Sequence, residues 1–360
     1  MPLCLDEDPS TYHPLAGVKF RSNDEFDECS AKCIHVGLIN NMPDGALQAT
    51  ERQFLTLLDS AAGDVLVRLS LYSIPEVPRA EWGRAHVARF YSDIDDLWDC
   101  QLDGLIVTGT EPRASNLTEE PYWQTLTSVL EWADHRTYST ICSCLAAHAA
   151  VLHMDGIGRR RLSDKRCGVF ELEPGVVHQL TAGISAPLRV PHSRWNDIPG
   201  DVLEQCGYRV LMRANDAGVD TFMKQRKSLF VFFQGHPEYE ANTLLLEYRR
   251  DVGRYLRGDR DTYPQLPDGY FDRNTIDALT EVRERAMSDR CEELIADFPT
   301  ALIEKEITNT WRPMAVRLYG NWLTLLCAQK ERRLKKRQYW KHLQAREVGL
   351  THALPRAEAK

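Results

Sequence analysis

Short apolar runs recur along the first part of the chain and alternate with longer segments of mixed character. The runs at residues 33–39, 65–71 and 103–109 are mainly apolar, which is typical of parallel strands buried on both faces of a sheet. The longer segments at residues 46–62 and 123–134 read as helices. Strands that alternate with helices of this length predict an α/β fold, with an open, mostly parallel sheet flanked by helices.

Beyond residue 167 the apolar runs become shorter and alternate more strongly with polar positions. We interpret them as a β-rich half that completes the same domain. A helix is expected at residues 239–257, after the last of these strands. The expected strands are residues 168–172, 188–190, 208–212, 221–223 and 229–233.

The pattern divides the chain into four regions. Residues 1–33 are polar and aperiodic and are interpreted as an N-terminal extension. The α/β domain is expected to span residues 34–258, and residues 259–273, rich in Pro, Asp and Gly, are typical of a linker. Residues 274–360 are expected to add C-terminal helices that end in a basic tail.

Residues 137–154 combine a short β-rich run, a cysteine and an Ala-rich helix. A strand that stops and feeds a helix presents the side chain at the turn from the carboxyl end of the sheet. The helix N-terminus there favours an anion. Cys144 sits at this break and is either a nucleophile or a buried structural cysteine. Cys142 lies inside the strand, faces the other way and is expected in the core.

A second strand ends at residues 229–239, where His236 and Glu238 follow the apolar residues. An imidazole can act as a general base, and a carboxylate can orient it. The alternative is a loop histidine beside a solvated glutamate. Because the two strand ends offer complementary groups, the working hypothesis is a Cys/His/Glu acyl-transfer site.

Other polar groups allow two interpretations each. The Pro-His-Ser-Arg-Trp segment at residues 191–195 would be a polar binding segment between strands or a turn. Lys165 and Arg250 are candidates for binding carboxylates or are surface residues. The basic residues 159–161 and 330–337 are interpreted as solvated faces. Zinc spacing and dinucleotide or phosphate-loop motifs are missing from the sequence, which predicts no metal and no bound cofactor.

The overall composition restricts the class of protein. A net charge of −8 disfavours nucleic-acid binding. No apolar run approaches the roughly 20 residues of a membrane helix, and the first residues lack the features of a secretory signal. The ten cysteines suit reduced thiols better than a disulfide framework. These features predict a cytoplasmic protein.

A set of ordered short motifs between residues 34 and 329 resembles the homoserine O-acyltransferases, meaning homoserine O-succinyltransferase and its acetyl-transferring relatives. These enzymes share the flavodoxin-like fold of class I glutamine amidotransferases. The motifs are Asn-Met-Pro at 41–43, Asp-Gly-Leu-Ile-Val-Thr-Gly at 103–109, Gly-Val-Phe-Glu at 168–171, Pro-His-Ser-Arg at 191–194, Gly-His-Pro-Glu-Tyr at 235–239 and Asn-Trp-Leu at 321–323, together with Cys144.

The resemblance implies a role in methionine biosynthesis and a ping-pong mechanism. An acyl group would pass from succinyl-CoA, as co-substrate, to Cys144 and then to the hydroxyl of L-homoserine. His236 would be the proton acceptor and Glu238 the third catalytic member. The implied substrate-binding residues are Lys165, Ser193 and Arg250. The expected oxyanion donors are the backbone N–H groups of Leu145 and of the loop at Asn41. The family also implies small-molecule substrates and a homodimer.

The chain departs from the family pattern in two loops near the expected site. Asp44-Gly45 replaces a lysine pair. The acyl-specificity position falls on Arg113, or on Glu111 with a small alignment shift; an arginine there would pair with a succinyl carboxylate or fill its space. Acetyl-CoA as donor, and L-serine or another hydroxy amino acid as acceptor, therefore stay open. A glutamine amidotransferase-like hydrolase is the alternative of another class, disfavoured because Ser143 and Leu145 flank the cysteine instead of glycines.

Overall fold

The computed structural model describes residues 3–5, 21 and 23–351, with side chains described as far as residue 340. Across these residues the strands form one ten-stranded sheet in the order β1-β3-β2-β4-β5-β10-β9-β8-β6-β7. The strands are β1 Leu3–Leu5, β2 Cys33–Ile39, β3 Leu66–Tyr72, β4 Gly104–Val107, β5 Ser139–Ser143, β6 Arg160–Pro174, β7 Leu188–Asp197, β8 Arg209–Ala214, β9 Gly218–Gln225 and β10 Leu229–Phe233.

The first five pairings of this described sheet, from β1 to β10, are parallel. The remaining four, from β10 to β7, are antiparallel. The sheet therefore confirms the predicted open α/β architecture with a β-rich second half. The structure assigns residues 191–195 to the middle of β7, so the prediction that they lie between strands is wrong.

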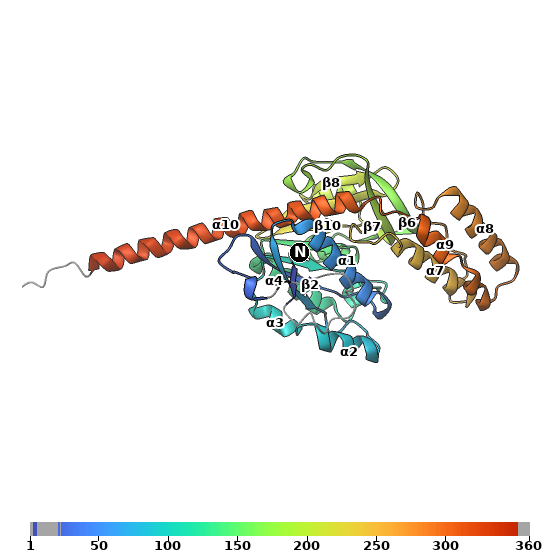
Figure 1. The fold of residues 1–360 in the computed structure, drawn as a ribbon, viewed down its shortest axis with the longest axis horizontal. Helices are drawn as coiled ribbons and strands as arrows, with labels where there is room; N and C mark the ends of the chain where they lie inside the picture. The colour runs from blue at the N-terminus through green and yellow to red at the C-terminus, as the bar shows by residue number, and fades with distance from the viewer. Residues whose placement is uncertain (1–2, 6–20, 22, 352–360) are drawn as a thin grey trace, which may run out of the picture.

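Helices cover both faces of the sheet (Figure 1). Phe54 of α1 and Trp322 of α10 pack with Ile106 of β4 on one face. The neighbouring Leu105 faces the opposite cluster with helices α4 and α5. The helices are α1 Asp44–Ala62, α2 Glu81–Phe90, α3 Ile94–Asp99, α4 Trp123–Arg136, α5 Leu145–Asp155, α6 Gly200–Gln205, α7 Thr243–Leu256, α8 Arg273–Ser288, α9 Thr300–Glu306 and α10 Arg312–Thr351.

The C-terminal helices occupy two places. Helices α7, α8 and α9 share a separate apolar cluster that includes Leu245, Leu279 and Ile303. Helix α10 lies along α1 and runs on past the strands, so that its C-terminal part projects from the body (Figure 1). The buried Lys330 fastens α10 to the sheet, because its Nζ donates to Cys33 O at 2.6 Å and to Asp103 Oδ2 at 3.0 Å.

Candidate functional site

The elbow between β5 and α5 holds Cys144 in an unusual backbone conformation. Its φ of 52° and ψ of −114° make it the one residue other than glycine with positive φ in the described part of the chain. Such a conformation costs free energy and persists only where neighbouring structure enforces it. The Cys144 N–H donates to Phe233 O at 2.8 Å, which ties the elbow to the end of β10.

Strand register brings the two predicted strand ends together. β5 and β10 are parallel neighbours, with Ser143 opposite Phe233, so the residues that follow each strand share one edge of the sheet. Cys144, directly after β5, and His236, three residues after β10, therefore lie at the same edge. His236 Nδ1 lies 2.9 Å from Glu238 Oε1. Because Nδ1 donates to that carboxylate, Nε2 is the nitrogen left to face the thiol.

Two negative charges control the ionisation of His236. The ring is buried, and burial alone lowers the pKa of an imidazole. The neighbouring Cys144 and Glu238 groups outweigh burial and raise the pKa of His236 well above its usual value. Tyr239 stacks on the ring with centroids 4.2 Å apart, which fixes its plane. The arrangement favours the protonated form of His236.

The three predicted substrate-binding residues meet around two carboxylates of α7 that sequence reasoning missed. Lys165 Nζ donates to Asp251 Oδ2 at 2.8 Å and lies 3.6 Å from Glu247 Oε2. The Ser193 hydroxyl donates to the same Glu247 oxygen. Arg250 Nη2 donates to Asp251 Oδ1 at 3.1 Å, and its side chain is 48% exposed. The spacing of Glu247 and Asp251 on one helix face was the available signal.

Glu247 connects this cluster to His236 through Tyr239. Burial raises the pKa of a carboxyl group, but Lys165, Arg250 and the Ser193 hydroxyl together lower the pKa of Glu247 below its usual value. The Tyr239 hydroxyl donates to Glu247 Oε1 at 2.7 Å, and the same tyrosine ring stacks on His236. A fixed, ionised carboxylate therefore lies one side chain away from the expected proton acceptor.

The backbone donors at the elbow differ from the expected set. The Asn41 N–H donates to Thr108 Oγ1 at 2.9 Å, so this group is already engaged and the expectation that it serves as an oxyanion donor is wrong. Within the described residues, the N–H groups of Gly109 and Leu145 donate to no other group. Gly109 packs directly on Leu145, because a Cβ at position 109 would lie 2.9 Å from Leu145 N. The elbow thus has two neighbouring backbone segments, at Gly109 and Leu145, whose N–H groups are not used within the described fold.

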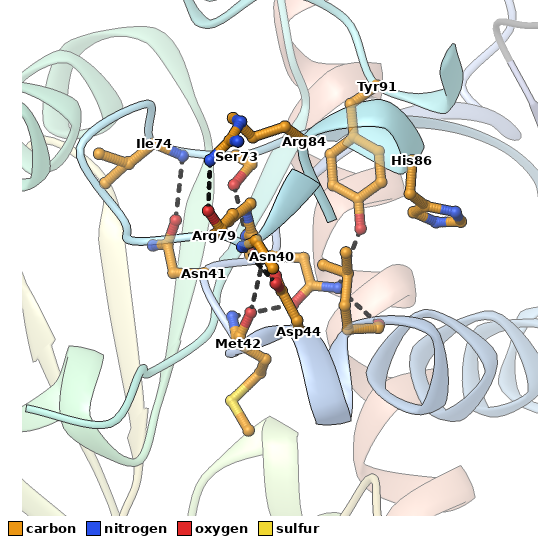
Figure 2. Close-up of polar contacts among 12 residues, drawn as sticks. Asn40, Asn41, Met42, Asp44, Ser73, Ile74, Arg79, Arg84, His86 and Tyr91 are labelled. Carbon is orange, nitrogen blue, oxygen red and sulfur yellow. Dashed lines mark hydrogen bonds and ion pairs between the residues drawn. The ribbon is translucent and has the colours of Figure 1, made fainter. Parts of the chain in front are cut away.

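A buried arginine fixes the loop that contains the replaced lysine pair (Figure 2). Arg79 donates to the backbone oxygens of Asn40 and Met42 at 3.1 and 3.0 Å. It also donates to Asp44 Oδ1 at 3.3 Å, and Asp44 Oδ2 accepts the Ala80 N–H at 2.6 Å. Asp44 thus anchors the start of α1 to the loop before α2. The residue that departs from the family pattern at this position therefore has a structural role.

The candidate acyl-specificity residues lie in an outward-facing loop. Arg113 and Glu111 are both exposed. The backbone N–H groups of Arg113 and Ala114 donate to Glu120 Oε1 at 2.6 and 2.7 Å, so a buried carboxylate shapes this loop. Glu111 Oε1 lies 3.5 Å from a guanidinium nitrogen of Arg254.

Within the described part of the chain, no cluster of His, Cys, Asp and Glu side chains has the grouping that holds a metal ion. Among the same residues, no helix is both long and apolar enough to span a membrane.

Comparison with known proteins assigns the chain to a family. Residues 2–333 match the homoserine O-succinyltransferase family. The chain belongs to this family. Homoserine O-succinyltransferase from Rhodopseudomonas palustris is 47% identical over 300 residues, which cover 83% of this chain and 90% of that protein. The enzyme of the same name from Bradyrhizobium japonicum is 42% identical, covering 91% of this chain and 99% of its own. The protein is therefore an acyltransferase, and the resemblance seen in its motifs is confirmed.

Solved structures of glutamine amidotransferases are also similar to this member of the homoserine O-succinyltransferase family. One from Methylobacillus flagellatus is 16% identical, with a TM-score of 0.47, and covers 82% of this chain and 95% of its own. Another, from Thermotoga maritima, is 12% identical, with a TM-score of 0.41, and covers 76% of this chain and 97% of its own.

Proposed function

We propose that this enzyme transfers the succinyl group of succinyl-CoA to the hydroxyl of L-homoserine, a step of methionine biosynthesis, through a thioester on Cys144. The observation that carries the proposal is the Cys144 elbow, tied to the end of β10 and followed there by His236, whose Nδ1 lies 2.9 Å from Glu238 Oε1. A thiolate is the reactive form of cysteine, and His236 is placed to exchange its proton. The names of the similar proteins supply the acyl group and the acceptor.

In the first half-reaction the Cys144 sulfur attacks the thioester carbonyl carbon of succinyl-CoA. The backbone N–H groups of Gly109 and Leu145 stabilise the oxyanion that forms. The carbon–sulfur bond to CoA then breaks, and the CoA sulfur takes the proton of His236. The products are free CoA, an acyl-cysteine and a neutral imidazole.

In the second half-reaction the homoserine hydroxyl gives its proton to the neutral His236, and its oxygen attacks the acyl-cysteine. The bond to Cys144 breaks and restores the thiolate beside a protonated imidazole. Glu238 orients the ring throughout by accepting from Nδ1. Each proton and electron pair returns to its starting place, so the cycle needs no metal or bound cofactor.

The cluster on α7 suits the amino-acid part of homoserine. The half-exposed Arg250 guanidinium and Lys165 supply positive charge for an α-carboxylate. The ionised Glu247 carboxylate suits an α-ammonium group, and Ser193 adds a hydroxyl beside it. Because Tyr239 links Glu247 to the ring of His236, an acceptor held there would lie next to its proton acceptor.

The test mixes the purified protein with succinyl-CoA or acetyl-CoA and with L-homoserine or L-serine, and follows free CoA by thiol release. Without acceptor, intact-mass analysis should show a succinyl group on the parent and none on Cys144→Ala. Absence of CoA release with every pairing would contradict an acyltransferase mechanism at Cys144. Faster release with acetyl-CoA or L-serine would replace the proposed donor or acceptor. The homodimer stays a prediction, for which light scattering is the measurement.

A further inference from the structure

Three consecutive arginines at the start of β6 have different surroundings. Arg160 forms an ion pair with Asp197 at 3.0 Å, and Arg161 stacks on an indole ring at 4.4 Å. Arg159 makes one long hydrogen bond, from Nη2 to Ser115 O at 3.4 Å. No carboxylate of the described residues forms an ion pair with it. Because a guanidinium stays charged in proteins, Arg159 is a cation without a counter-ion in contact.

Arg159 contacts the loop that packs on the elbow, because its Nη2 donates to Ser115 O at 3.4 Å and Gly109, at the start of that loop, packs on Leu145 next to Cys144. The Arg159 side chain is half-buried; burial lowers the pKa of Arg159, while the nearby groups of Tyr122, Glu120 and Cys144 act to raise it. A partly desolvated cation is costly unless an anion or hydrogen-bond acceptors compensate it. Glu120, an acidic side chain of the same region, uses one oxygen to accept two backbone N–H groups of the loop at residues 113–114.

A second unused donor lies beside this cation. Tyr122 is 3% exposed, and its hydroxyl has no hydrogen-bond partner among the described residues. Buried hydroxyl groups are normally satisfied, so an unpartnered one points to a missing acceptor. Tyr122 and Arg159 both adjoin the loop at residues 109–115: Arg159 donates to Ser115 O, and Glu120, two residues before Tyr122, accepts from the backbone of the same loop.

The other guanidinium near Cys144 has no such free capacity. Arg194 donates to His192 Nδ1 at 3.2 Å, to Asp197 Oδ1 at 2.9 Å and to Ala217 O. Its charge is therefore neutralised and its donors are used within the fold. Of the guanidinium groups that interact with Cys144, Arg159 is the one able to receive an anionic ligand.

We infer that Arg159 and the Tyr122 hydroxyl bind the free carboxylate of a dicarboxylic acyl group carried on Cys144. This inference rests on the proposed function and adds the residues that select the donor. In a succinyl thioester the second carboxylate lies three carbon–carbon bonds beyond the thioester carbonyl, and an acetyl group lacks it. A guanidinium and a hydroxyl together supply the donors that a carboxylate accepts. The exposed Arg113 lies in the loop next to this region and is the alternative selector.

The experiment measures kcat/KM for succinyl-CoA and for acetyl-CoA in the parent, Arg159→Gln, Arg159→Lys and Tyr122→Phe. Arg161→Gln is the matched control, because that arginine stacks on Trp195. For Arg159→Gln we expect kcat/KM with succinyl-CoA to fall about 10- to 100-fold, with acetyl-CoA nearly unchanged. Tyr122→Phe should cause a smaller loss of the same kind, and Arg159→Lys should keep part of the preference. Arg161→Gln should keep the parental ratio of kcat/KM for succinyl-CoA to that for acetyl-CoA.

The outcomes separate this inference from the proposed function. If the parent is not succinylated on Cys144 in intact-mass analysis, the proposed function is wrong. If the parent is succinylated but Arg159→Gln keeps its preference, the carboxylate site is wrong. An equal fall in kcat/KM with succinyl-CoA and with acetyl-CoA would also overturn the inference, because Arg159 would then act on CoA or on the thiolate. If Arg113→Gln changes the ratio of kcat/KM for succinyl-CoA to that for acetyl-CoA and Arg159→Gln does not, Arg113 is the residue that selects the acyl donor.

Discussion

Gly109→Ala tests the contact between the end of β4 and the elbow. An added Cβ would lie 2.9 Å from Leu145 N and 2.9 Å from Leu145 Cβ. The second distance is about 0.6 Å short of the roughly 3.5 Å at which carbon atoms rest against each other. Gly109 is not among the described glycines with positive φ, so alanine meets no backbone strain there. The substitution therefore acts by moving two backbone segments apart.

This displacement should affect stability and chemistry by different amounts. Overpacking in a well-packed region costs about 1–3 kcal/mol of unfolding free energy. Moving one oxyanion donor out of place costs about 10²- to 10³-fold in rate, or about 3–4 kcal/mol of transition-state stabilisation. Urea unfolding measures the first effect, and single-turnover succinylation of Cys144 measures the second. The fall in the succinylation rate should be larger than the fraction of Gly109→Ala protein that is unfolded under the assay conditions.

Gly45→Ala is the matched control, because no atom lies within 4 Å of a Cβ at this position in the first turn of α1. We expect it to keep the parental rate and to gain up to about 1 kcal/mol of stability from reduced unfolded-chain entropy. If Gly109→Ala is destabilised but succinylates at the parental rate, Gly109 and Leu145 are not the oxyanion donors. If neither stability nor rate changes, the close packing of Gly109 on Leu145 is itself wrong.

Further predictions concern the charges of the site and of α10. Glu238→Gln removes the carboxylate that holds His236 Nδ1 and should slow succinylation about 10²- to 10⁴-fold; parental rates would contradict this orienting role. Cys144→Ala removes the thiolate and should lower the pKa of His236 in NMR titration. Because this folded-state pKa is raised, the stabilisation by protonated His236 is complete below about pH 6.5 and is lost as pH rises through the folded value. Lys330→Met leaves Asp103 without its cation and should cost about 3 kcal/mol in urea unfolding; a loss below about 1 kcal/mol would contradict it.

The buried elements could be predicted from the sequence, because a strand buried on both faces consists mainly of apolar residues. The bounds of β2 and β10 match the expected strands at residues 33–39 and 229–233. The first half of β6, at residues 160–166, is polar and exposed or partly exposed, so it lacks the apolar signal and was missed. β1 is three residues long, too short for periodicity, and was predicted as part of an N-terminal extension.

The position of Cys144 at a strand-to-helix break could be predicted from local pattern, but the surroundings of charged residues could not. Lys330 belongs to a basic run expected to be solvated, yet it is buried against β2 and Asp103. Arg159 was also expected on a solvated face, but it is half-buried and makes one long hydrogen bond to Ser115 O, with no ion pair to a described carboxylate. Each outcome depends on contacts between residues far apart in the chain, which spacing along one segment does not encode.

The pKa of His236 links the two halves of the proposed cycle. In the free enzyme, Cys144 and Glu238 raise the pKa of the buried ring, which suits the proposed acid that gives a proton to departing CoA. Acylation converts the thiolate into a neutral thioester and so removes one of those two charges. Burial then opposes Glu238 alone, and the pKa of His236 must fall. The same histidine becomes a base at the stage when the homoserine hydroxyl has to lose its proton, and no conformational change is required for the exchange of roles.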